Sequence, residues 1–91
     1  MQESEIEAAV CNYAKSKYKW LVYKFVSPSN RGVPDRLFIR NETVFFIEFK
    51  AWNKIPTKLQ KRVITKIRNQ GVDVYVVDSI KQGKEIFDAR G

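Results

Sequence analysis

Alternating and helical hydrophobic patterns divide the N-terminal half of the chain into a helix and a first strand. Apolar positions at three- and four-residue spacing predict a helix over residues 4–17, and Ser4 with Glu7 fits a capping box at its start. Residues 20–26 are rich in aromatic and branched side chains and predict a strand. The segment 27–34 contains two prolines and a glycine, which predict a loop.

Two more strands are predicted in the middle of the chain. They cover residues 36–40 and 43–50 and are joined by a tight turn at Asn41-Glu42. The second of them, TVFFIEFK, is apolar on both faces until it reaches Glu48. A strand of that kind is typical of the centre of a sheet that is covered on both sides.

The remaining sequence predicts a helix, a strand and a last helix. The first helix opens at Thr57 and ends at Gly71, a residue type common just past a helix C-terminus. A short buried strand follows at 72–77, and an amphipathic helix starts at Ser79, weakened by Gly83. The two strands that enclose the first helix should be parallel. The element order therefore predicts an α/β fold with an α-β-β-β-α-β core, a mixed central sheet flanked by helices, and a C-terminal helix.

Length and composition fit one soluble domain spanning residues 1–91. The chain is 44% hydrophobic and 30% charged, and no apolar run reaches the roughly 20 residues that cross a membrane. The N-terminus is acidic rather than signal-like, so we expect an intracellular protein without membrane contact. One cysteine, Cys11, and no histidine exclude an intramolecular disulfide, a cysteine zinc site and histidine catalysis.

The charge of the chain favours a polyanionic partner. Seventeen lysines and arginines against ten acids give a net charge of +7, with an isoelectric point of about 9.7. Between Lys50 and Val72 there are seven bases and no acid. This block indicates nucleic acid before a membrane surface, and a helix face kept soluble by its charge is the simpler alternative.

Two acids and one base gather at one end of the predicted hairpin. If the hairpin is symmetric about its turn, Asp35 lies opposite Glu48, and Lys50 lies on the same face as Glu48. Facing carboxylates repel unless a cation or a proton lies between them, and oxygen ligands suit Mg²⁺ or Mn²⁺. Lys50 could then orient or deprotonate a water for in-line attack on a phosphodiester. The alternative is a structural salt bridge, Glu48–Lys50 or Asp35–Arg36.

The same residues carry a resemblance to a known family. The segments 32–35 (GVPD) and 48–50 (EFK) resemble the signature of the PD-(D/E)xK nucleases. The wider strings 31–36 (RGVPDR) and 46–50 (FIEFK) are similar to the virus-type replication-repair nuclease (VRR-NUC) family and, more distantly, to archaeal Holliday junction resolvases. The resemblance spans nearly the whole chain and implies a restriction-endonuclease-like core.

The resemblance implies a role for each matched residue. Asp35, Glu48 and the main-chain carbonyl of Phe49 would ligate Mg²⁺ or Mn²⁺, and Lys50 would be the catalytic lysine. A glutamate from the first helix usually completes such sites.

We favour Glu3 for that glutamate by the family spacing, although Glu7 lies one turn later on the same face. A glutamine in the second helix, Gln60, corresponds to a family active-site glutamine. It also fits a capping box with Thr57, and that alternative stays open.

Basic residues around this site predict a DNA-binding surface that follows phosphates without reading bases. The predicted contacts are Lys24, Arg31, Arg36, Lys54, Lys58, Lys61 and Arg62. Lys24 can equally be a solvent-facing strand lysine, and the two arginines can simply balance the charge of Asp35. Trp52 either stacks on an exposed base or lies in the core or an interface.

Together these features predict a divalent-metal-dependent, structure-selective DNA endonuclease. Stand-alone members of the resembled family act as dimers on four-way junctions, which implies a Holliday-junction-resolving homodimer in the cytoplasm of a bacterial or phage-infected host cell. Four aromatic residues favour an exposed interface patch: Tyr13, Tyr18, Trp20 and Tyr23. The alternative is a non-catalytic nucleic-acid-binding protein on a nuclease-like fold.

Overall fold

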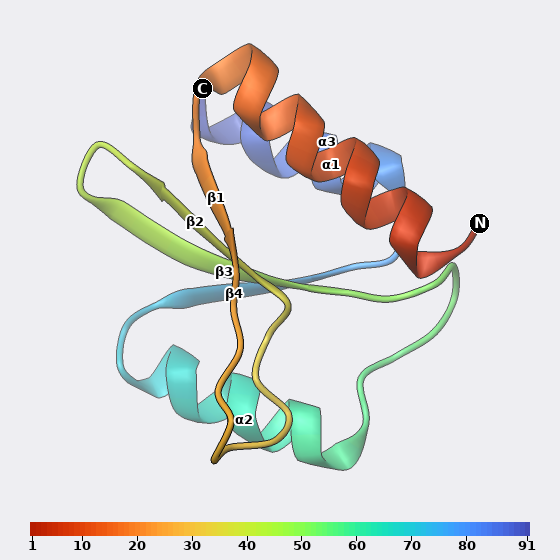
Figure 1. The fold of residues 1–91 in the computed structure, drawn as a ribbon, viewed down its shortest axis with the longest axis vertical. Coiled ribbons are helices and arrows are strands. Elements are labelled where there is room, and N and C mark those ends of the chain that lie inside the picture. The colour runs from red at the N-terminus through yellow and green to blue at the C-terminus, as the bar shows by residue number, and fades with distance from the viewer.

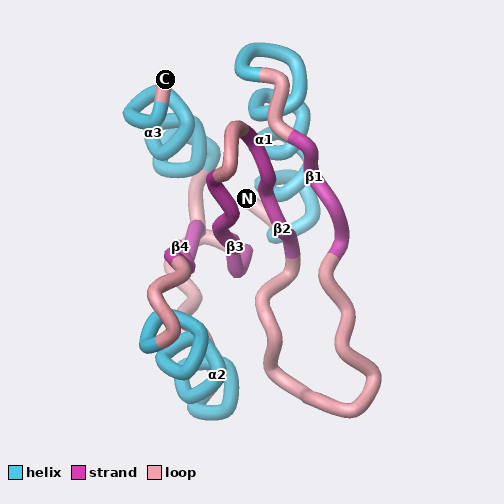
Figure 2. The backbone as a smooth tube through the Cα atoms, turned by 90° about the vertical axis from the view of Figure 1, so that its left-hand side faces the viewer, coloured by secondary structure: helices cyan, strands magenta, loops and turns pink.

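The computed structural model describes residues 1–91 and contains a mixed four-stranded sheet between helices (Figure 1). In chain order the elements are α1 (Glu3–Tyr18), β1 (Leu21–Lys24), β2 (Arg36–Arg40), β3 (Thr43–Phe49), α2 (Lys58–Asn69), β4 (Asp73–Val77) and α3 (Ile80–Arg90). The strand order is β1-β2-β3-β4, with antiparallel pairing except between β3 and β4, which are parallel. Helices α1 and α3 lie on one face of the sheet and α2 on the other (Figures 1 and 2). The predicted fold class is confirmed.

The β2–β3 hairpin has the predicted symmetric register. Asn41 and Glu42 both have positive φ, 47° and 67°, as a two-residue type I′ turn requires. The ladder runs from Arg40 opposite Thr43 to Arg36 opposite Ile47. Asp35, the residue just before β2, therefore reaches the end of β3 that carries Glu48 and is followed by Lys50.

Strand β3 is the central strand of the core, as its apolar run predicts. Phe45, Ile47 and Phe49 are fully buried and pack with residues of α1 and α3, such as Val10 and Phe87. The alternating positions of β3 point to the opposite face, where α2 lies. One face of β3 thus builds the core, and the other is available to a site.

Helix α2 begins and ends as predicted. The Thr57 hydroxyl accepts a hydrogen bond from the Gln60 backbone and the Gln60 side chain accepts one from the Thr57 backbone, which completes the capping box. Gly71 follows the helix with a φ of +88°, which glycine adopts without strain. The first turn of α2 is therefore firmly placed, and Gln60 with it.

The first predicted helix start is wrong in one respect. Gln2, not Ser4, is the N-cap of α1, and it makes no side-chain cap. Glu7 is unavailable for a capping box because it pairs with Arg36. Strand β1 is also shorter than the predicted 20–26: Trp20 precedes it and is buried in the core at 3% exposure, and Phe25 and Val26 lie in the loop that follows.

Gly83 holds α1 and α3 together rather than simply weakening α3. A Cβ added at Gly83 would lie 2.4 Å from Cγ2 of Val10. The missing side chain therefore permits the close approach of the two helices over the core.

The predicted aromatic surface patch is wrong for most of its members. Trp20 is buried, while Tyr13 and Tyr18 are half-buried and donate their hydroxyls to Asp88. Tyr23 is exposed on β1. Trp52 is also exposed, which excludes a place in the core of this chain. None of the three helices has the length and apolar character needed to cross a membrane.

Candidate active site

Three acids from three different elements meet at one end of the sheet. Glu3 comes from the first turn of α1, Asp35 directly precedes β2, and Glu48 lies near the end of β3. One carboxylate oxygen from each residue lies within 4.8 Å of the other two. The structure thus brings together the three acids for which the sequence predicts a shared site.

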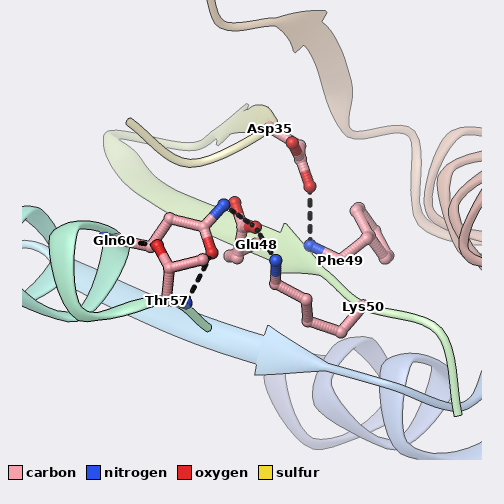
Figure 3. A network of polar contacts seen from close by, with 6 residues as sticks. All are labelled: Asp35, Glu48, Phe49, Lys50, Thr57 and Gln60. Carbon is pink, nitrogen blue, oxygen red and sulfur yellow. Dashed lines mark hydrogen bonds and ion pairs between the residues drawn. The ribbon is translucent and has the colours of Figure 1, made fainter. Parts of the chain in front are cut away.

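Asp35 is fixed by backbone hydrogen bonds on both of its sides. Its Oδ2 accepts a 2.8 Å hydrogen bond from the backbone N–H of Phe49 (Figure 3), and its own carbonyl accepts one of 2.9 Å from the backbone N–H of Phe25. Pro34, just before it, is fully buried. These contacts therefore fix the position of Asp35, although it lies outside any strand.

Glu48 is buried to 2% exposure and is only partly satisfied. Its Oε2 lies 3.4 Å from Nζ of Lys50 and accepts a 3.0 Å hydrogen bond from Nε2 of Gln60 (Figure 3). Its Oε1 is buried without a partner. Buried carboxylate oxygens normally have partners, so this orphan oxygen indicates a ligand position. The Glu48–Lys50 salt bridge of the simpler interpretation exists, but it leaves half of the carboxylate unexplained.

The surroundings raise the pKa of all three carboxyl groups. Burial, followed by the charge of Asp35, raises the pKa of Glu48 to about 7. Burial is also the main cause that raises the pKa of Asp35 and of Glu3. Each anion is thus disfavoured by its surroundings, and a bound divalent cation would stabilise it.

The donor set fits Mg²⁺ or Mn²⁺. It consists of hard carboxylate oxygens, one of them buried and free, without any nitrogen or sulfur ligand. Cys11 is buried in the core and its pKa is raised by burial to about 11, so it offers no thiolate.

The two glutamates of α1 have different surroundings. Glu3 joins the acid cluster, whereas Oε2 of Glu7 accepts a 2.6 Å hydrogen bond from Nε of Arg36. Both are on the face of α1 that meets the sheet. The sequence pattern pointed to Glu3 by spacing, and nothing in it pointed to the Glu7–Arg36 pair.

Gln60 closes the capping box and also contacts Glu48. Its Oε1 accepts from the Thr57 backbone N–H in the capping box, while its Nε2 donates to Glu48. The two alternatives are compatible because one amide has a donor and an acceptor end.

The predicted DNA contacts are distributed unevenly about this site. Lys54, Lys58, Lys61 and Arg62 are exposed and make no ion pair. Arg31 is exposed in the loop before Asp35, and Lys24 is exposed on the edge strand β1. Arg36 differs from them, because it is half-buried and already bound to Glu7.

A mixed sheet that brings three acids and a lysine together at the end of its central strands is the arrangement of a PD-(D/E)xK nuclease. "Putative nuclease p44" of Acyrthosiphon pisum secondary endosymbiont phage 1 is 39% identical over 80 residues, covering 87% of this chain and 85% of the relative. A solved VRR_NUC domain matches with a TM-score of 0.76 and 31% identity, covering 91% of this chain and 95% of that chain. No protein-family profile matches the sequence. The chain belongs to the VRR-NUC family of nucleases.

Proposed function

We propose that this protein is a divalent-metal-dependent, structure-selective DNA endonuclease that hydrolyses phosphodiester bonds. The observation that carries the proposal is the buried, unpartnered Oε1 of Glu48 within the cluster formed with Glu3 and Asp35. Such an oxygen is costly to bury as an anion unless a cation or a hydrogen-bond donor binds it. Lys50 stands beside the same carboxylate, where the chemistry would take place.

Glu3, Asp35, Glu48 and the carbonyl of Phe49 would hold Mg²⁺ or Mn²⁺. When bound, the cation supplies charge stabilisation for the phosphate oxygens and lowers the pKa of water. Lys50 is only 15% exposed along its side chain, so its ammonium is confined beside Glu48. From there the ammonium can orient the attacking water, and the neutral amine could take the proton that the water loses as the new P–O bond forms and the ester P–O bond breaks, with the leaving oxygen protonated from solvent.

Gln60 would act as a positioning residue in this centre. Because its Nε2 donates to Oε2 of Glu48, it leaves Oε1 free for another ligand. The capping box with Thr57 fixes the Gln60 side chain in turn. The start of α2 therefore orients the buried carboxylate.

Unpaired cations on α2 and the neighbouring loops would bind the DNA backbone. Lys58, Lys61 and Arg62 are exposed on α2, with Lys54 in the loop before it. Lys24 and Arg31 extend this basic surface. Phosphate contacts of this kind give affinity that falls with salt and depends little on sequence.

A homodimer acting on four-way junctions is the preferred form of this activity. An apolar part of the sheet face supports a subunit contact: Leu21, Tyr23 and Val44 are 53%, 54% and 43% exposed. A two-fold axis would oppose two active sites, as paired cuts in a symmetric junction require. The phage source of the 39% identical relative supports action inside an infected bacterial cell.

The test compares cleavage of a labelled four-way junction with a matched flap and duplex in Mg²⁺, Mn²⁺ and EDTA. Paired symmetric nicks in the junction, dependent on metal, are the expected result, together with a dimeric mass by light scattering. Cutting of flap or duplex by a strict monomer would overturn the junction and the dimer while leaving the nuclease. Binding without cutting in every metal would favour a non-catalytic DNA-binding protein.

A further inference from the structure

A pocket of about 660 Å³ opens between the β1–β2 loop and α2, beside the acid cluster. Figure 2 shows this long loop extending from the sheet toward the side on which α2 lies. The pocket is within the size range of small-ligand sites, roughly 300–1,000 Å³. Its main lining residues are Phe25, Arg31, Phe46, Leu59, Arg62 and Lys66.

The floor of the pocket is aromatic. The rings of Phe25 and Phe46 lie with centroids 5.1 Å apart, and both side chains are only half-buried. The core of this protein buries other phenylalanines completely, so these two rings are left accessible at a place where α2 could have covered them. A flat, apolar ligand would complete their burial.

The rim of the pocket is cationic. Arg31, Arg62 and Lys66 line it, no acidic residue does, and none of the three makes an ion pair. An aromatic floor under a cationic rim matches a nucleotide, whose base is flat and whose phosphate is negative.

The floor of the pocket shares strand β3 with the proposed active site. Phe46 lies two residues before Glu48 on the same face of β3, a separation of about 7 Å along the strand. One base step of stacked DNA is about 3.4 Å, so a nucleotide in the pocket would lie about two steps from a phosphate at the acids. The Phe25 backbone also donates to the carbonyl of Asp35, which ties the pocket floor to the acid cluster.

The wall of the pocket is preformed. Gly32, at a φ of +84°, seats the loop against α2, because a Cβ there would lie 3.0 Å from Cγ of Leu59. The loop therefore rests on α2 through backbone contact, which fixes this wall of the pocket.

We propose that this pocket binds one unpaired nucleotide of the DNA substrate about two nucleotides from the scissile phosphate, with the base on Phe25 and Phe46 and the phosphate on Arg31, Arg62 and Lys66. The inference rests on the proposed nuclease function, and it explains why the nuclease would select branched DNA over duplex DNA. A base within an intact duplex is paired and stacked, whereas a base at a branch or bulge is free to enter.

The test measures DNA binding without cleavage, in a Lys50→Ala background, by fluorescence anisotropy. Three end-labelled DNAs of equal length are compared: a paired duplex, a duplex with one bulged nucleotide, and the same bulge lacking its base. We expect the bulged nucleotide to be bound about tenfold more tightly than the other two DNAs, the size of one base–aromatic stack. Equal binding of the bulges with and without the base would overturn the proposal.

Variants of the pocket separate the base from general DNA affinity. Phe25→Leu should abolish the tenfold preference, whereas Phe25→Tyr should keep it, because the aromatic face is restored. Arg62→Ala should weaken binding of the bulge, and Lys81→Ala, on the exposed far side of the sheet, should change nothing. A preference unchanged in Phe25→Leu would assign it elsewhere.

Cleavage by the chain with Lys50 intact, in Mn²⁺, distinguishes the two proposals. A preference for the bulge without cutting of any DNA would overturn the proposed nuclease activity and support the nucleotide pocket. Cutting without any preference for the unpaired base would overturn the nucleotide pocket and support the nuclease activity.

Discussion

Nε of Arg36 donates a 2.6 Å hydrogen bond to Oε2 of Glu7, and this pair fastens α1 to β2 beside the acid cluster. Both side chains are less than a quarter exposed. Glu7 lies one turn after Glu3, and Arg36 directly follows Asp35. The ion pair therefore sets the distance between two acids that belong to different elements.

Removing one member of this pair should cost stability and displace Glu3. We expect Glu7→Ala to lower the free energy of unfolding by about 2 kcal/mol, because the half-buried guanidinium of Arg36 loses its charged partner. Urea denaturation measures the change, with Glu5→Ala as the control in the same helix turn. If the pair is coupled, Glu7→Ala combined with Arg36→Ala will cost less than the two single changes added together.

Glu3 and Glu5 should differ sharply although both are exposed in the first turn of α1. Only Glu3 reaches Asp35 and Glu48, so Glu3→Gln should lower the affinity for Mn²⁺ at least about tenfold. Glu5→Gln should leave it unchanged. Calorimetric titration with Mn²⁺ measures both, and equal effects of the two substitutions would show that only general charge matters.

Close packing of α1 on α3 makes Gly83 a sensitive position. Gly83→Ala would place a Cβ 2.4 Å from Val10, and overpacking of this size costs about 1–3 kcal/mol. Thermal unfolding should show the loss, and Lys81→Ala on the same helix should not. The space freed by Val10→Ala should make the double variant more stable than the sum of its parts; strict additivity would argue against the clash.

Asp88 should give part of the stability an acid dependence. Hydrogen bonds from Tyr13 and Tyr18 lower the pKa of Asp88 below its usual 3.8. Its contribution is therefore present above pH 3.8 and lost as the pH falls through the lower folded-state pKa. Asp88→Asn should be less stable than the original chain at pH 7, with the difference closing at low pH in urea titrations. A difference independent of pH would exclude this linkage.

Local rules were enough to predict most of the fold. The Asn41-Glu42 turn fixed the hairpin register, and the Thr57–Gln60 capping box placed α2, since both depend on neighbouring residues. Glu48 could be singled out because no packing reason explains an acid within an apolar strand. In that sense the sequence predicts where the acids would meet.

The features that the sequence predicted wrongly or missed depend on contacts between residues far apart in the chain. Glu7 fits a capping box locally, but its carboxylate instead accepts a hydrogen bond from Arg36, which is 29 residues away in the sequence. Trp20 has a residue type typical of strands, but its side chain packs in the core against Phe45 of β3 and Phe87 of α3. The pocket floor of Phe25 and Phe46 comes from separate elements, and no spacing along the chain indicates that the two rings meet.

We expect the three acids to hold a cation and Lys50 to perform chemistry beside it. The most direct test combines Mn²⁺ titration with the rate of DNA cleavage in Lys50→Ala and Glu48→Gln. Lys50→Ala should still bind Mn²⁺ and lose at least about 100-fold in rate, as for a missing proton-transfer group, whereas Glu48→Gln should lose both. Cleavage by Lys50→Ala at the original rate, or no Mn²⁺ binding by the original chain, would contradict the account.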